Sequence, residues 1–211
     1  MDPCACLVFA KAPRPGQCKT RLATAVGEEA AATLARALLR DTVRGLSAHP
    51  GLAVIVSTTD PTVDHGVEAP LWDQGGGELG ARLERGFRRA LGDFDRAIAV
   101  GADSPGLPDG HLVALRAALA HGAAIGPTED GGFWGLGLRS APEGLLLGLP
   151  WSTSRTAAAT VDRLRAHDVA LRWAPPWWDV DHPADLGRLR REIPRERAPA
   201  THAVLDGLGW P

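Results

Sequence analysis

The chain has 211 residues and a formal net charge of −2, a length that predicts one domain with a full hydrophobic core. The balanced charge argues against nucleic acid as a partner, and the lack of an 18-residue apolar run argues against a membrane span. Three cysteines without metal-ligand spacing argue against a disulfide framework. We therefore expect a cytoplasmic protein.

Short apolar runs alternate with helical patterns, which is typical of an α/β domain with a largely parallel sheet. In chain order the sequence predicts a strand over 5–10, a helix over 28–46, strands over 52–58 and 69–72, a helix over 79–91, a strand over 97–100, a helix over 108–120, strands over 123–127 and 133–138, a helix over 153–166, a strand over 169–173 and a helix over 183–191. The stretch after residue 193 is rich in proline and charge, so we expect one domain over 1–193 and a peripheral helix or tail over 194–211.

The loop after the first predicted strand holds both lysines of the chain, Lys11 and Lys19, while the other 21 basic residues are arginines. A lysine carries a compact charge on a flexible stem, which suits it to reach a phosphate in a crowded loop. Chance is the alternative explanation in a chain this rich in arginine. With Gly16 and Arg21, the loop has the parts of an anion site. It lacks the upstream glycine of a Walker A motif.

Acidic residues follow two later predicted strands. Asp103 ends a buried strand, so its carboxylate is expected to point into the crevice at the carboxyl edge of the sheet, although it could instead form a turn. Asp179 and Asp181 form a second acidic element, and one of them could cap the next helix. Two carboxylates from distant loops, together with substrate phosphates, are the usual ligands of Mg²⁺.

Three further segments have both a structural and a functional interpretation. The loop over 126–132 is either a tight hairpin or a substrate-facing loop, and Gln74 with the glycines after it forms either a turn or a close approach to a flat base. Ser152 or Thr153 could cap the following helix. The seven histidines are scattered and do not predict a metal site or a catalytic triad.

Taken in order, these motifs resemble one family, the bacterial rSAM/selenodomain-associated transferase 1 group, over about residues 7–189. The motifs that carry the resemblance are Phe9-Ala-Lys-Ala-Pro-Arg-Pro-Gly16, Lys19-Thr-Arg-Leu22, Gln74-Gly-Gly-Gly-Glu-Leu-Gly80, Gly101-Ala-Asp-Ser-Pro-Gly-Leu-Pro108, Gly126-Pro-Thr-Glu-Asp-Gly-Gly132, Trp151-Ser-Thr153 and Asp179-Val-Asp181. The resemblance implies the GT-A fold of nucleotide-diphospho-sugar transferases, a mostly parallel mixed sheet flanked by helices. More distantly, the chain is similar to phospholactate guanylyltransferase and molybdenum-cofactor guanylyltransferase.

The resemblance also implies the roles of individual residues. Lys19 and Arg21 would hold nucleotide phosphates and act in catalysis with Asp103, while Asp103 and Asp181 would bind Mg²⁺ or Mn²⁺. The candidate nucleotide-binding residues are Lys11, Pro15, Gly16, Lys19, Thr20, Arg21, Gln74 and Gly75. The candidate substrate-binding residues are Asp130, Gly131, Gly132, Trp151, Ser152 and Thr153.

Three functions remain open at this point. The leading hypothesis is a Mg²⁺-dependent nucleotidyltransferase that joins a nucleotide from an NTP to a small phosphorylated or phosphonate acceptor and releases pyrophosphate. Pro13 and Pro15 replace the Gly-Gly run that nucleotidyltransferases commonly carry in this loop, and this keeps a glycosyltransferase with an NDP-sugar donor as the alternative. A catalytically silent nucleotide-binding domain is the third. The base, the acceptor and the oligomeric state are not predicted.

Overall fold

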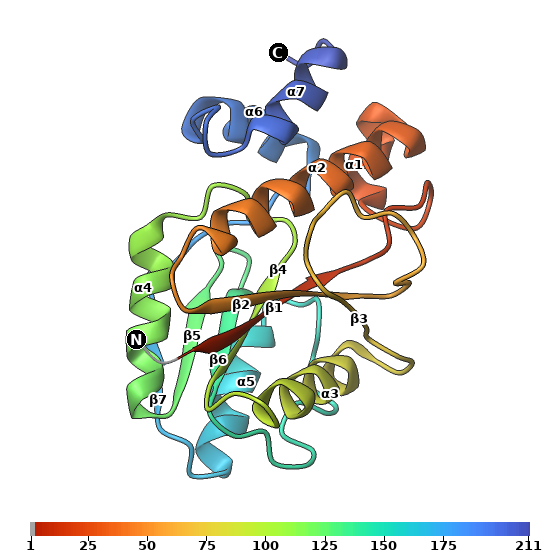
Figure 1. Cartoon of the computed structure of the whole chain (residues 1–211). Helices are drawn as coiled ribbons and strands as arrows, with labels where there is room; N and C mark the ends of the chain where they lie inside the picture. The colour runs from red at the N-terminus through yellow and green to blue at the C-terminus, as the bar shows by residue number, and fades with distance from the viewer. Residues whose placement is uncertain (1–2) are drawn as a thin grey trace.

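A seven-stranded sheet forms the centre of the molecule in the computed structural model, which describes residues 3–211 (Figure 1). From one edge to the other its strands are β3 (Leu71–Asp73), β2 (Leu52–Thr58), β1 (Cys4–Ala10), β4 (Ala97–Gly101), β6 (Phe133–Leu138), β5 (Ala123–Pro127) and β7 (Leu171–Trp173). β6 runs antiparallel to both of its neighbours, and every other pair is parallel. The predicted α/β fold with a mostly parallel mixed sheet is therefore confirmed.

Helices cover both faces of this sheet. They are α1 (Thr20–Val26), α2 (Glu28–Ser47), α3 (Leu79–Leu91), α4 (Asp109–Ala118), α5 (Thr156–Ala166), α6 (Pro183–Glu192) and α7 (Pro199–Gly207), with a 3₁₀ turn over Leu119–His121. Because side chains alternate along a strand, Cys6 and Val8 of β1 pack under α2 and α4, while Ala5 and Leu7 pack against α3 and α5. The alternation thus divides the apolar interior into two layers.

A third apolar layer lies on the outer side of α2. Leu34 and Leu38 of that helix pack with Leu22 of α1, Leu186 of α6 and Leu205 of α7, and all five side chains are fully buried. The C-terminal segment, for which the sequence left a helix or a tail open, therefore contains a helix that packs along α2. Helix α2 is buried on two sides, which accounts for its many alanines and leucines.

The short helix α1 is the main element that the sequence patterns did not predict. It has seven residues and is separated from α2 only by Gly27, whose φ of +85° lies in the left-handed region that glycine tolerates. So short a segment shows too few turns for an apolar period to stand out. Other differences are shifts of element ends: α5 begins at Thr156 rather than at residue 153, and β3 spans Leu71–Asp73 rather than 69–72.

Strand direction brings four loops to one edge of the sheet. β1 and β4 are parallel neighbours, and β5 shares their direction because the antiparallel strand β6 stands between it and β4. β7 is parallel to β5. The segments that follow these four strands therefore start at the same edge, which is where open α/β sheets bind ligands.

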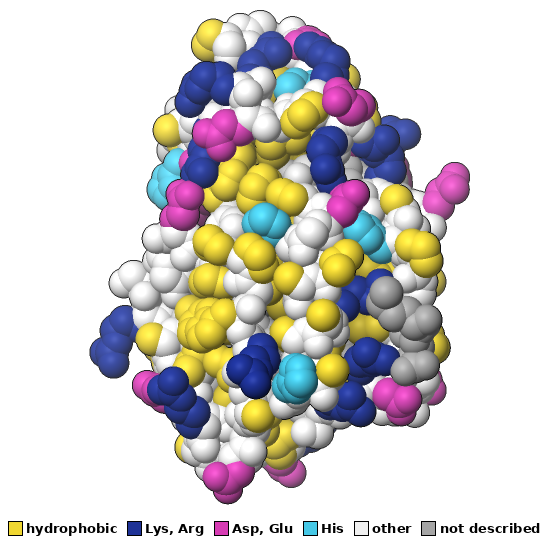
Figure 2. Space-filling model, turned by 90° about the vertical axis from the view of Figure 1, so that its left-hand side faces the viewer, with side chains coloured by type: hydrophobic (Ala, Val, Ile, Leu, Met, Phe, Trp, Pro, Cys, Tyr) yellow, Lys and Arg dark blue, Asp and Glu magenta, His cyan; other side chains and the backbone are white. Residues whose placement is uncertain are grey.

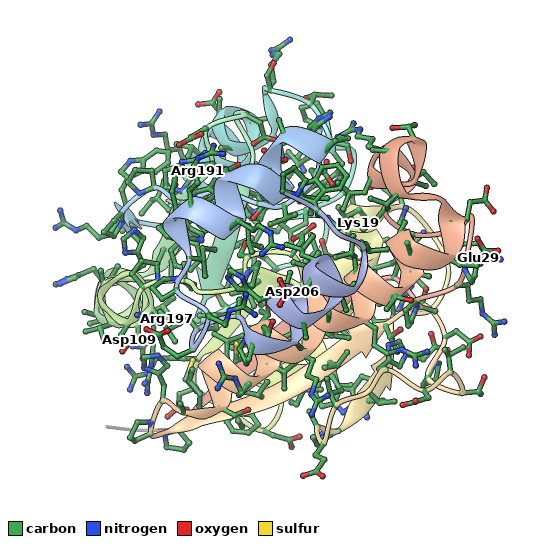
Figure 3. All side chains as sticks on the ribbon, turned by 90° about the horizontal axis from the view of Figure 1, so that it is seen from above. Lys19, Glu29, Asp109, Arg191, Arg197 and Asp206 are labelled. Atoms are coloured by element: carbon green, nitrogen blue, oxygen red, sulfur yellow. The ribbon has the colours of Figure 1, made fainter. Side chains whose placement is uncertain are left out.

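The surface carries charges of both signs. On the face that includes α4, basic and acidic side chains are interspersed with apolar ones (Figure 2). Near the C-terminus Asp206 forms ion pairs with Arg190 and Arg195, and Arg197 pairs with Asp109 (Figure 3). Among the helices of residues 3–211, none combines the length and the apolar character that crossing a bilayer requires.

One buried carboxylate fixes the start of α7. Asp41 of α2 is 1% exposed, and its oxygens accept hydrogen bonds from the backbone N–H of Ala200 at 3.1 Å and from the N–H and hydroxyl of Thr201, both at 2.7 Å. The first N–H groups of a helix have no partner within the helix, so a buried helix start needs such an acceptor. Asp41 supplies it from a position 160 residues before Thr201.

We expect Asp41→Ala to lower the free energy of unfolding by about 2–4 kcal/mol, because it leaves buried backbone donors without an acceptor. Urea denaturation monitored by circular dichroism measures the change. Asp162→Ala is the matched control, since Asp162 is an exposed helix residue with only a loose ion pair to Arg165; there we expect a change within about 0.5 kcal/mol. Equal losses in the two variants would show that Asp41 does not anchor α7.

Candidate functional site

An open cleft of about 710 Å³ lies at the edge of the sheet where the segments that follow β1, β4, β5 and β7 meet. Its lining contains Lys11, Lys19, Thr20 and Arg21 from the segment after β1, and Asp103 from the loop after β4. It also contains Thr128, Asp130 and Gly132 from the loop after β5, Trp151, Ser152 and Thr153 from the segment before α5, and Asp179, Asp181 and His182 from the segment after β7. Most of the predicted site residues therefore share one cleft.

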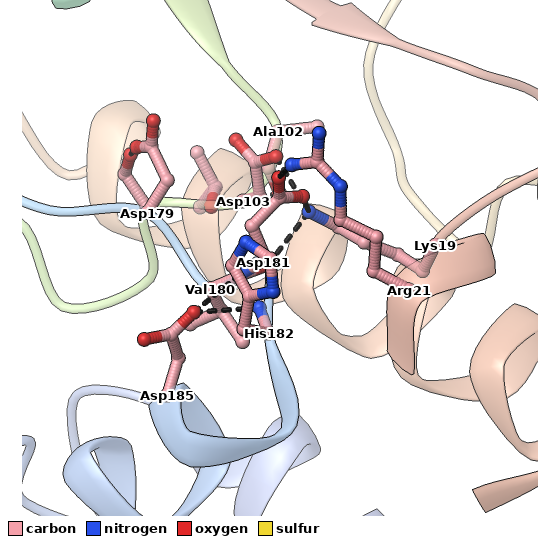
Figure 4. Close-up of polar contacts among 11 residues, drawn as sticks. Lys19, Arg21, Ala102, Asp103, Asp179, Val180, Asp181, His182 and Asp185 are labelled. Atoms are coloured by element: carbon pink, nitrogen blue, oxygen red, sulfur yellow. Dashed lines mark hydrogen bonds and ion pairs between the residues drawn. The ribbon is translucent and has the colours of Figure 1, made fainter. Parts of the chain in front are cut away.

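Lys19 joins three of these segments (Figure 4). Its ammonium nitrogen Nζ donates to Oδ2 of Asp103 at 2.6 Å, to the carbonyl oxygen of Val180 at 2.7 Å and to Oδ1 of Asp181 at 3.1 Å. The Lys19 side chain is 12% exposed. Burial lowers the pKa of this lysine, but the charges and hydrogen bonds of Asp103 and Asp181 outweigh that effect, so its pKa is raised. The two carboxylates thus favour the charged form of Lys19 in this site.

The backbone of Lys19 adopts a costly conformation. Its φ of +45° and ψ of +42° lie in the left-handed region, where a side chain with Cβ crowds the backbone. The residue stands immediately before α1, so the turn there directs its side chain inward. In Figure 3 Lys19 lies inside the outline of the molecule, whereas Glu29 points away from α2. Non-glycine residues held in this region cluster at functional sites.

The segment after β7 is fixed to the loop after β4 at Val180. The N–H of this fully buried residue donates to the carbonyl oxygen of Asp103 at 2.9 Å, while its own carbonyl accepts from Lys19. The start of α6 is capped by Asp185, whose Oδ2 accepts from the N–H groups of Asp181 and His182 at 2.9 and 2.6 Å. His182 and Asp185 thus form a capping box at the start of α6, and the carboxylate of Asp181 takes no part in it.

Arg21 adds a second cation at the mouth of the site. Its Nη1 lies 2.5 Å from Oδ2 of Asp181, and its side chain is 59% exposed. Burial alone would raise the pKa of Asp181, but the charges and hydrogen bonds of Lys19 and Arg21 lower it. Asp181 is thus an ionised group held between a buried and an exposed cation.

Asp179, which sequence reasoning noted but did not include among the site residues, also lines the cleft. It accepts a hydrogen bond from the hydroxyl of Ser104. Burial, followed by the negative charge of Asp103, raises its pKa to about 7. The Asp-Val-Asp spacing was the signal for this residue, but the pattern does not show which of the two aspartates meets Lys19.

Two loops, over residues 128–132 and 151–154, form the opposite wall of the cleft and pack closely on each other. Oδ1 of Asp130 accepts from the Thr128 hydroxyl at 2.5 Å and from the Gly132 N–H at 3.0 Å, which closes a tight turn. Gly131 has a φ of +87°, and a Cβ there would meet the carbonyl oxygen of Ser154 at 2.1 Å. The glycine is therefore required by both conformation and space.

Helix α3 holds the segment that carries the aromatic part of this wall. Buried Glu84 accepts from the N–H groups of Gly144 and Leu146 at 3.0 and 3.1 Å, and Glu78 accepts from the N–H of Gly148 at 2.8 Å. A Cβ on Gly80 would meet the Leu146 carbonyl at 2.0 Å and Nε1 of Trp151 at 2.6 Å. The predicted Gly-Glu-Leu-Gly motif thus fixes the segment that ends in Trp151.

Four predicted nucleotide-binding residues lie outside the cleft lining: Pro15, Gly16, Gln74 and Gly75. The amide nitrogen of buried Gln74 donates to the carbonyl oxygens of Ala10 and Ser57, at 3.1 and 2.7 Å. Gly16 has a φ of +72° and forms part of the turn before Lys19. Gly131, predicted to bind substrate, is likewise not in the lining. These residues shape the loops, and a ligand contact for them stays a prediction.

The oxygen atoms around Lys19 have the chemistry that a hard divalent cation requires. Carboxylate oxygens of Asp103 and Asp181 and the carbonyl oxygen of Val180 all lie within 3.1 Å of one nitrogen atom. Mg²⁺ takes such oxygen ligands and usually only one or two carboxylates from the protein. Within residues 3–211, no three His, Cys, Asp or Glu side chains form a ready metal cluster. The residues fit a cation shared with a substrate, in the place that the ammonium now takes.

Comparisons with known proteins agree with this fold. A family model described as an uncharacterized protein conserved in bacteria (DUF2064) matches residues 57–153. No curated protein matches the sequence significantly. A provisionally named nucleotide-diphospho-sugar transferase from Desulfovibrio desulfuricans G20 superposes with a TM-score of 0.82 at 28% identity, covering 99% of this chain and 97% of its own.

Two further solved structures share the fold at lower identity. One is CMP:2-keto-3-deoxy-manno-octonic acid synthetase in complex with CTP, with a TM-score of 0.52 at 16% identity over 90% of this chain and 98% of that one. The other is 2-C-methyl-D-erythritol 4-phosphate cytidylyltransferase from Thermus thermophilus, with a TM-score of 0.54 at 19% identity over 90% of this chain and 98% of its own. The chain has the fold of the nucleotide-diphospho-sugar transferase superfamily.

We expect Gly80→Ala to destabilise the protein, although alanine favours a helix by about 1 kcal/mol over glycine. The new Cβ has no room beside Leu146 and Trp151, so the segment before α5 must shift. The matched control is Gly45→Ala, since Gly45 lies inside α2 with no atom within 4 Å of a Cβ; it should leave the thermal midpoint unchanged or raise it. Thermal unfolding of the two variants measures the difference, and a stabilised Gly80→Ala would contradict the close packing.

Proposed function

We propose that the protein is a Mg²⁺-dependent nucleotidyltransferase that joins a nucleotide from an NTP to a small phosphorylated or phosphonate acceptor. The observation that carries this proposal is the pairing of Lys19 and Arg21 with the carboxylates of Asp103 and Asp181 at the carboxyl edge of the sheet. Cations for phosphates and carboxylates for a metal are the two halves of a phosphoryl-transfer site. The CTP bound to the synthetase with this fold accords with a nucleoside triphosphate donor.

The segment over residues 11–21, which follows β1 and carries Lys11, Lys19 and Arg21, would bind the triphosphate. Exposed Arg21 and Lys11 line the mouth of the cleft, where incoming phosphates meet them first. An acceptor oxygen attacks the α-phosphorus, the bond between the α-phosphorus and the bridging oxygen breaks, and pyrophosphate leaves with that oxygen. Lys19 and Arg21 stabilise the negative charge that spreads over the phosphate oxygens in this step.

Asp103 and Asp181 would hold the divalent cation. When bound, Mg²⁺ neutralises phosphate charge and orients the donor. Asp179 lies beside Asp103, and its hydrogen bond from Ser104 fixes the direction of its carboxyl group. Because Asp103 and Asp181 both contact Lys19, a cation held by the two carboxylates and the cations of residues 11–21 would act on the same donor phosphates.

A glycosyltransferase with an NDP-sugar donor is the second candidate, and the opposite wall of the cleft favours it. The lysines and arginines in the described lining all come from the 11–21 loop, whereas the opposite wall presents Asp130, Thr128 and Ser152 beside Trp151. Trp151 forms an edge-to-face pair with Phe133, with ring centroids 6.0 Å apart. Carboxylates, hydroxyls and aromatic rings suit the hydroxyls and apolar faces of a sugar.

One assay separates the two candidates. We expect purified protein with Mg²⁺, the common NTPs and a panel of sugar phosphates to release pyrophosphate. Asp103→Asn should lower kcat/KM at least about 100-fold, because it removes a carboxylate that would hold the divalent cation on the transferring phosphates. Asp64→Ala is the control, since Asp64 is 79% exposed and lies outside the cleft lining, where it pairs with Arg36 at 3.6 Å and accepts from the N–H of Gly66 at 2.8 Å.

The outcome also identifies the donor. Release of NDP from an NDP-sugar without pyrophosphate from any NTP would replace the nucleotidyltransferase by the glycosyltransferase. Nucleotide binding that persists in Asp103→Asn, without turnover of either donor in the wild type, would leave a catalytically silent nucleotide-binding domain.

A further inference from the structure

We infer that Lys19 is the resident cation of the acidic site: its ammonium group and the divalent metal ion take the same place between Asp103 and Asp181, so the metal enters only when substrate phosphates draw Lys19 away. The inference rests on the proposed metal-dependent transfer, and it adds an order of binding to it. Free metal alone would bind weakly, and metal accompanied by phosphates would bind well.

The hydrogen-bond capacity of Lys19 supports this assignment. An ammonium group has three N–H donors and no acceptor. Nζ of Lys19 has three acceptors, on Asp103, Val180 and Asp181, within 3.1 Å. All three donors are therefore used inside the protein, and none is left for a phosphate. Lys19 can bind a phosphate only after it releases at least one of these oxygens.

Electrostatic repulsion prevents the ammonium group and the metal ion from occupying the site together. The Lys19 side chain is 12% exposed, so solvent screens its charge poorly. A divalent ion on the same carboxylates would stand next to a trapped ammonium group and be repelled by it. If Lys19 left without a replacement, Asp103 and Asp181 would remain near each other and near Asp179 without their buried counter-ion. The negative charge of the carboxylates is compensated when either the ammonium group or the metal ion occupies the site.

The backbone of Lys19 supports an exchange of partners. A left-handed conformation is unfavourable for lysine, and here no side chain caps the start of α1. The three contacts of the ammonium group help to hold the residue in place. When phosphates replace those contacts, the turn before α1 is free to relax. The four-carbon stem lets the charge move toward the cleft without a change of fold.

The test compares Mn²⁺ binding to three full-length proteins without nucleotide, by electron paramagnetic resonance of the free ion. Lys19→Met removes the charge and keeps an unbranched side chain that is one atom shorter. Arg21→Met is the matched control, because Arg21 also pairs with Asp181 but is exposed. We expect Lys19→Met to bind Mn²⁺ at least about tenfold more tightly than the wild type, because a poorly screened like charge is lost. For Arg21→Met we expect a change within about threefold.

Equal Mn²⁺ affinity of the wild type and Lys19→Met would overturn the inference, since the two cations would then not compete. Adding Asp181→Asn to Lys19→Met should abolish the gain, and a gain that persists would place the metal elsewhere. Pyrophosphate release is a separate measurement: competition without turnover would preserve the inference and refute the proposed function.

If Lys19→Met does not fold, a measurement on the wild type tests whether Lys19 leaves the acidic residues. With ¹⁵N-lysine labelling, the chain gives only two side-chain ammonium signals, which Lys11→Arg assigns. We expect the Lys19 signal to stay in place with Mg²⁺ alone and to move when inorganic tripolyphosphate is added with Mg²⁺. A Lys19 signal that does not respond to Mg²⁺ with tripolyphosphate, while Lys11 does, would show that Lys19 is a fixed structural cation.

Discussion

A buried ammonium group needs several acceptors, and the rest of the site is arranged around that need. The ammonium group of Lys19 brings together segments that follow β1, β4 and β7, with partners 84 and 161 or more positions away in sequence. Each of the three segments would be a surface loop by itself. Strand direction brings them to one edge, and the shared cation holds them within hydrogen-bond distance.

The acidic residues depend on secondary contacts that leave their carboxylates available. Val180 donates to the Asp103 backbone, so Asp179 and Asp181 stand on either side of a fixed, buried residue. Asp185 caps α6, and Ser104 orients Asp179. Such supporting hydrogen bonds tune the groups they hold as much as direct partners do. The opposite wall is supported differently, by close backbone packing at Gly80 and Gly131.

The sequence predicts the fold well because its strands and most helices carry clear apolar periods. Lys19, Arg21, Asp103 and Asp181 line one cleft in the structure, and the sequence indicates this placement because each follows a predicted strand and parallel strands end at the same edge. It does not predict that Lys19 contacts the acidic residues themselves, because that depends on the left-handed turn before α1. The role of Glu78 and Gly80 is not predicted either. A glycine-rich motif is typical of a turn, and the sequence does not show which segment packs on it.

The rarity of lysine has a practical consequence for chemical probes. Both lysines of the chain line the cleft: Lys11 is exposed, whereas the Lys19 side chain is only 12% exposed and pairs with Asp103 and Asp181. Amine-selective acylating reagents with an affinity for the cleft would therefore meet Lys11 as their accessible lysine, while Lys19 is shielded by its ion pairs. In this protein a lysine-directed covalent label is also a label of the candidate active site.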